Sequence, residues 1–166
     1  MIRSTHNQSN ALNALEALRG VLREIGWESY PVDPEGVIAI DLRSPDSPVS
    51  DALAAIALKS ERFIFYLNLA RHCPVERQDQ LVQLINLINW QLSIGNFEMD
   101  PKDGHVRFRS SIDFADAVLE PQLIRNHILA AMRATETYVE SLLNVMEGRS
   151  DAADAFIKAL ATPKNS

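Results

Sequence analysis

With 166 residues, of which 46% are apolar and 23% charged, the chain is long enough for one domain with a proper core. Its net charge of −6 and pI of about 5.2 argue against a nucleic-acid partner, because such binding depends on clustered Lys and Arg. The sequence contains one cysteine, no apolar run near the ~18–20 residues of a membrane span, and no apolar signal-peptide core. These features predict a cytoplasmic protein without disulfides or membrane contact.

The first predicted element is a helix that begins after Ser9 or Asn10, both good N-caps, and ends at Gly26. Its apolar residues recur at every third or fourth position, as expected for a helix with one buried face: Leu12, Leu15, Leu18, Leu22 and Ile25. Residues 1–8 are polar and are predicted to form a flexible N-terminus.

Four strands are predicted to follow this helix. Residues 27–32 and 37–42 are rich in β-branched or aromatic side chains, and residues 63–69 have the strongest strand composition in the chain. Residues 51–58 are ambiguous, because their alanines favour a helix. A polar turn at residues 59–62 would, however, join them to the next strand as a hairpin, and we therefore predict a strand there.

The second half of the chain predicts three helices and a hairpin. One helix starts at Pro74 and runs to residue 92 with a wide apolar stripe, which indicates that it is mostly covered. The longest helix is predicted over residues 121–147, and a short helix over 151–160 is capped by Ser150. Residues 162–166 are predicted to be a flexible tail.

The hairpin between these helices has a register that residue types alone predict. About the turn at residues 100–104, positions whose numbers add to 205 are expected to face each other. The resulting pairs are Phe97 with Phe108, Met99 with Val106, Glu98 with Arg107, and Asn96 with Arg109. A slip of one residue would place Phe97 opposite Arg107, so both faces of the hairpin favour one register.

The element order is therefore α-β-β-β-β-α-β-β-α-α, with hairpins in place of parallel crossovers. This order predicts an α+β fold in which helices pack on a mainly antiparallel sheet. We expect a single domain over residues 9–161.

No set of residues predicts catalysis. His72 and Cys73 are adjacent in an extended segment, where neighbouring side chains point to opposite sides and cannot form an activated pair. Acidic and histidine side chains near the hairpin turn lack calcium-loop spacing, and the turn itself explains them: Glu98, Asp100, Asp103 and His105. The sequence therefore predicts no enzymatic activity, no cofactor and no metal.

Two predicted strands are apolar on both faces, although antiparallel sheets usually keep one polar face. Either the helix over residues 75–92 forms a second layer, or a subunit or client protein covers one face. Tyrosine is a frequent interface anchor. We therefore predict a partner-binding surface that includes Ile64 and Tyr66, with Ile38 and Ile40.

The hairpin and the long helix carry a family resemblance. Its motifs are Asn89-Trp90, Gly95 to Asp100, Asp103-Gly104 followed by Val106 to Arg109, and Glu136-Thr137-Tyr138. Together they cover roughly residues 81–148 and resemble the YbjN-like family of bacterial sensory-transduction regulators. That family is similar in fold to class I type III secretion chaperones. The Ala-rich run at 52–57 and the helix after Gly148 depart from the pattern.

The resemblance implies a small, acidic, non-enzymatic protein that forms a homodimer. From it we expect a protein-interaction or regulatory module that binds a partner polypeptide in the cytoplasm. A small-molecule-sensing domain, with a pocket between the sheet and the long helix, is the alternative. An enzyme of an unrecognised type is a third possibility.

Overall fold

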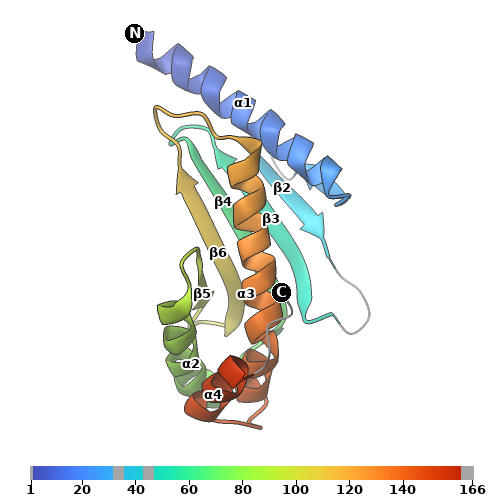
Figure 1. The fold of residues 1–166 in the computed structure, drawn as a ribbon, viewed down its shortest axis with the longest axis vertical. Helices are drawn as coiled ribbons and strands as arrows, with labels where there is room; N and C mark the ends of the chain where they lie inside the picture. Colours follow the sequence, from blue (N-terminus) through green and yellow to red (C-terminus); the bar gives the residue numbers. More distant parts are fainter. Residues whose placement is uncertain (1, 32–35, 43–46, 162–166) are drawn as a thin grey trace.

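The computed structural model describes residues 2–31, 36–42 and 47–161, with side chains from Asn10 onward. Within these residues, helices pack against a six-stranded sheet in which every pairing is antiparallel (Figure 1). The predicted α+β class and the predicted order of helices and strands are confirmed.

The sheet has the strand order β1-β2-β3-β4-β6-β5. Its strands are β1 (Ser29–Pro31), β2 (Val37–Asp41), β3 (Val49–Ala57), β4 (Arg62–His72), β5 (Asn96–Met99) and β6 (His105–Asp113). The ambiguous Ala-rich segment is β3, as predicted, and it lies in the middle of the sheet with partners on both sides. Residues 51–55 pair with β2 on one side and β4 on the other, and these hydrogen bonds outweigh the helix preference of alanine.

The helical elements are α1 (Ile2–Glu24), the single 3₁₀ turn η1 (Val75–Arg77), α2 (Gln78–Gln91), α3 (Pro121–Met146) and α4 (Ala152–Ala161). Two predicted caps are wrong. Helix α1 begins at Ile2, and the Asn10 amide within it donates to Glu61 Oε1 (2.7 Å) and Ala117 O (2.9 Å) instead of capping. At α4 the cap is Asp151, whose Oδ1 accepts the N–H of Asp154 at 2.9 Å, and not Ser150.

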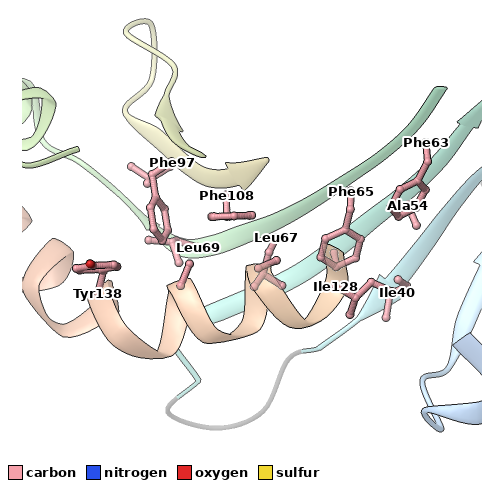
Figure 2. Packing of buried hydrophobic residues seen from close by; sticks show 14 of the residues in the cluster. Ile40, Ala54, Phe63, Phe65, Leu67, Leu69, Phe97, Phe108, Ile128 and Tyr138 are labelled. Atoms are coloured by element: carbon pink, nitrogen blue, oxygen red, sulfur yellow. The ribbon is translucent and has the colours of Figure 1, made fainter. Parts of the chain in front are cut away.

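One face of the sheet is covered by helices and carries the core. Figure 2 shows the large side chains of β4 lying against α3, and the four at alternate positions are all at most 2% exposed: Phe63, Phe65, Leu67 and Leu69. Helix α1 contacts β3 and α3, so the two longest helices lie over the same face.

The predicted second helix layer over residues 75–92 is wrong. Helix α2 contacts β5, α3 and α4, and so it lies on the same side as the other helices, at the β5 edge. Asn89 fixes it there, because its side chain bonds both backbone groups of Phe97: Oδ1 accepts from the nitrogen (2.9 Å) and Nδ2 donates to the oxygen (3.0 Å). The apolar stripe of α2 is buried at this edge through Leu81, Leu84, Ile85 and Ile88.

Candidate protein-interaction surface

The face of the sheet opposite the helices carries a group of half-buried apolar side chains. Two rows of the antiparallel ladder build it, since residues that pair directly across strands share a face. We call this group the sheet-face patch, and it consists of Val37, Ala39, Leu53, Ala55, Ile64 and Tyr66. The patch spans three neighbouring strands of the sheet, β2, β3 and β4.

The structure separates the four residues that were predicted to bind a partner. Ile64 and Tyr66 belong to the sheet-face patch. Ile38 and Ile40 are 3% and 1% exposed and pair with Ala54 and Ala52 on the helix-covered face. They belong to the core and cannot share a surface with Ile64. For Ile64 and Tyr66, partner binding stays a prediction.

Val37 and Ala39 were missed because residue types alone do not distinguish the two faces of β2. Residues 37–42 are apolar at nearly every position, so alternation did not distinguish inward from outward side chains. The register with β3 makes the choice, because it places Val37 beside Ala55 and Ala39 beside Leu53. The face on which each β2 side chain lies therefore depends on pairing with β3, which residue types alone do not show.

Polar side chains border the patch on the β6 side. The guanidinium carbon of Arg107 lies 4.2 Å from the ring centroid of Tyr66, in cation–π geometry. Arg107 Nε also lies 2.5 Å from Glu98 Oε1, and Arg109 Nη1 lies 4.0 Å from Glu98 Oε2. These contacts confirm the predicted hairpin register, in which Glu98 faces Arg107. They also hold the Tyr66 ring at the edge of the patch.

A second polar border lies along the ends of β3 and β4. Asn68 is 7% exposed, and its Nδ2 donates to Asp51 Oδ1 at 2.5 Å. Asp51 also accepts a hydrogen bond from Ser50 Oγ at 2.7 Å through its other carboxylate oxygen. The patch is thus an apolar centre with charged and amide groups at its margin, the usual composition of a protein-binding surface.

Exchanging the charges of Glu98 and Arg107 tests how much this pair contributes to stability. We expect Glu98→Arg combined with Arg107→Glu to lower the free energy of unfolding by no more than about 1 kcal/mol, because half-exposed pairs contribute little. Urea denaturation of the double variant measures the change. A loss beyond about 2 kcal/mol would mean that the contact between Arg107 and Tyr66 supports the fold itself.

The two candidate groups for chemistry have structural explanations. Cys73 is buried, and burial is the main reason why the pKa of its thiol is raised. A raised pKa makes the nucleophilic thiolate scarcer. His72 is exposed, and its Nδ1 lies 3.1 Å from Asp103 O and 3.7 Å from Asp103 Oδ2. The histidine is therefore engaged with the hairpin turn.

The acidic groups of the hairpin turn bind its backbone. Asp100 Oδ1 accepts the N–H of Lys102, and Asp103 Oδ1 accepts the N–H of His105, both at 2.9 Å. Over the part of the chain that the structure describes, no group of three His, Cys, Asp or Glu side chains could hold a metal ion. None of the described helices is long and apolar enough to cross a membrane.

The comparison with family models identifies one family, and the comparison with solved structures finds a similar fold. Residues 14–144 match the sequence model of the YbjN family, described as "Putative bacterial sensory transduction regulator". A chain in the crystal structure of the ExsC–ExsE complex has a similar fold, with a TM-score of 0.52 and 15% identity over 77% of this chain and 92% of that chain. A chain of the HopA1–SchA chaperone–effector complex has a TM-score of 0.49 and 17% identity over 83% and 93% of the two chains. No curated protein sequence matches the chain.

Proposed function

We propose that this chain, which belongs to the YbjN family, is a non-catalytic protein-interaction module that binds a partner polypeptide on the sheet-face patch. The observation that carries the proposal is the patch itself. Its apolar side chains lie on the face of the sheet away from the helices of the described chain, whereas the opposite face is filled by the core. Burial of such a patch against a second protein is favourable at roughly 25 cal/mol per Å² of apolar area.

The fold comparison supports this proposal. The ExsC–ExsE structure is a complex of two proteins, and one of its chains shares the overall fold described above. The likeness concerns the fold and not particular contacts. A chain with this arrangement of helices and sheet is thus found in a complex with another protein, which supports the proposed role.

The composition of the surface suggests how the partner is held. Tyr66 offers a large aromatic area at the edge of the patch, and Ile64 and Leu53 offer aliphatic area beside it. The polar border formed by Arg107, Glu98 and Asp51 remains available for hydrogen bonds at the rim. We expect a partner segment with an apolar face and a polar margin. A cytoplasmic location and a homodimer remain part of the proposal.

A charge placed in the patch tests the proposal. We expect Ile64→Glu to fold like the parent, because Ile64 is half-buried and lies outside the core, but to lose its bound protein. The matched control is Leu129→Glu on α3, which introduces the same charge at a residue that is 48% exposed. Tagged forms of both variants and of the parent are used to capture proteins from a lysate of the native organism.

The expected result is a stoichiometric protein that the parent and Leu129→Glu retain and that Ile64→Glu does not. A folded Ile64→Glu variant that retains the same protein would contradict the proposal. Sedimentation of all three forms shows whether the patch binds a second copy of the chain. A parent dimer that Ile64→Glu converts to a folded monomer would assign the patch to a second copy of the chain instead.

A further inference from the structure

Neither edge of the sheet is a good template for an added strand. At the β5 edge the Asn89 side chain occupies both backbone groups of Phe97, with Oδ1 2.9 Å from the nitrogen and Nδ2 3.0 Å from the oxygen. At the other edge, β1 has three residues and ends in Pro31, which has no N–H to donate. Short strands, proline and covering groups are the usual protections of a sheet edge. The face of the sheet is therefore better suited to a partner polypeptide than its edges.

The sheet-face patch favours a helix over an extended segment. The backbone at its centre, residues 51–55, pairs with strands on both sides, and the patch side chains are apolar apart from the hydroxyl of Tyr66. An extended segment laid on this surface would bury N–H and C=O groups without partners, which is costly. An α-helix satisfies its own backbone and needs only an apolar stripe. With strands ~4.8 Å apart, β2 to β4 span roughly 10 Å, about the diameter of a helix.

The margin of the patch along β6 carries an excess of positive charge. Arg109 lies directly opposite Tyr66 in the ladder, and its side chain is 43% exposed. Arg107 and Arg109 both have Glu98 as an ionic partner, at 2.5 Å and 4.0 Å, so two guanidinium groups share one carboxylate. Arg109 is the more weakly neutralised of the two. It is therefore placed to pair with a carboxylate of a helix that lies on the patch.

The margin at the ends of β2 and β3 carries negative charge. Asp41 and Asp51 lie directly opposite each other in the ladder, at alternate positions to the core residues of their strands and so on the same face as the patch. Like charges that face each other across two strands destabilise a sheet. A basic side chain of a partner would relieve the repulsion between these two aspartates.

We propose that the partner polypeptide binds the sheet-face patch as an amphipathic α-helix, with a basic flank over Asp41 and Asp51 and an acidic flank over Arg109. The apolar stripe of this helix lies on the patch itself. The inference rests on the proposed function and adds the conformation and the charge pattern of the bound segment.

Four labelled synthetic peptides of about 18 residues, long enough to form a helix in water, test this inference. All four carry the same leucine stripe at helical spacing. The mixed peptide has lysine along one flank of the stripe and glutamate along the other, and the proline peptide is the mixed peptide with a central proline. The lysine peptide and the glutamate peptide carry one kind of charge on both flanks. Fluorescence anisotropy measures binding at physiological ionic strength, where the overall charge of the protein is largely screened.

The parent is expected to bind the mixed peptide roughly threefold more tightly than the lysine or the glutamate peptide, the effect of one charge pair at the rim of an interface. Binding of the proline peptide should be weaker by more than about tenfold, because a central proline breaks the helix. Ile64→Glu should abolish binding, whereas Leu129→Glu on α3 should not, which locates the peptide on the patch.

Two charge variants test the margins. Arg109→Glu should shift the preference to the lysine peptide, because both margins are then acidic. Arg133→Glu is the matched control, since Arg133 is an exposed arginine on α3 and its replacement changes the net charge by the same amount; it should keep the preference of the parent. Asp41→Lys should bind the glutamate peptide as tightly as the mixed peptide.

Three results would overturn the inference: no saturable binding of the mixed peptide to the folded parent, equal binding of the proline peptide, or an equal effect of Arg109→Glu and Arg133→Glu on the preference. Equal binding of the proline peptide would indicate an extended segment. A parent dimer that the mixed peptide does not dissociate would assign the patch to a second copy of the chain. If Ile64→Glu loses the captured protein but no peptide binds the parent, the proposed function stands and the helical partner is wrong.

Discussion

Replacing Gly104 by alanine is expected to lower the free energy of unfolding by about 2–5 kcal/mol, from backbone strain and a steric clash together. Gly104 closes the β5–β6 turn with a φ of +73°, and its N–H donates to Asp100 O at 2.8 Å. A Cβ at this position would lie 2.1 Å from the oxygen and 2.9 Å from the nitrogen of Cys73. These are backbone atoms, and Cys73 N also donates to Gly104 O at 2.8 Å, so the two segments cannot separate freely.

Gly26→Ala is the matched control for this substitution. Gly26 has nearly the same φ, +74°, but a Cβ there would meet no described atom within 4 Å. The control therefore carries the strain of the left-handed backbone alone, about 1–2 kcal/mol. Chemical denaturation of both variants separates the two effects. Equal losses for Gly104→Ala and Gly26→Ala would show that the contact with Cys73 relaxes at little cost.

The hairpin that contains Gly104 was predictable because its information is local. Residues 96–99 and 105–109 lie within one short segment, and both faces of the hairpin require the same register. The four predicted pairs are all present in β5 and β6. The same segment carries part of the family motif, and the family that the motif indicates is confirmed.

The candidate site was only half predictable, because it depends on pairing between strands that are distant in sequence. A run such as residues 37–42, apolar at nearly every position, is compatible with either face of a sheet. Only the register with β3 places Ile38 and Ile40 inside and Val37 and Ala39 outside. In residues 63–69, by contrast, the polar Asn68 shares a face with Ile64 and Tyr66, which distinguishes that face from the fully apolar core face.

Contacts between helices were the least predictable part, because single polar side chains set them. Arg77 Nε donates to Val145 O at 2.8 Å and its Nη2 donates to Ser150 O at 2.7 Å, which joins the start of α2 to the end of α3. Gln80 Oε1 accepts the N–H of Ala152 at 3.0 Å and so attaches α4. These bonds place α2 beside α3 and α4. A stripe of apolar residues alone indicates that a helix is covered but not by which neighbour.

Truncation of Phe97 is expected to have the other large effect. Phe97 is 1% exposed, and its ring meets that of Phe108 edge to face, with centroids 5.2 Å apart and planes at 82° (Figure 2). Its backbone is held by Asn89, so the chain cannot shift to fill the space. We expect Phe97→Ala to cost about 3–5 kcal/mol, as truncations of core phenylalanines do.

Trp90→Ala is the control for the loss of an aromatic ring from the same region. Trp90 follows Asn89 in α2 and is 88% exposed, so we expect its removal to change the free energy of unfolding by less than about 0.5 kcal/mol. Phe108→Ala and the double variant complete a cycle, in which we expect a coupling of about 0.5–3 kcal/mol because the two rings are in contact. Urea denaturation measures all four variants. If Phe97→Ala unfolds at the same urea concentration as the parent, this face of the hairpin is not part of the core, and the register of β5 and β6 must be revised.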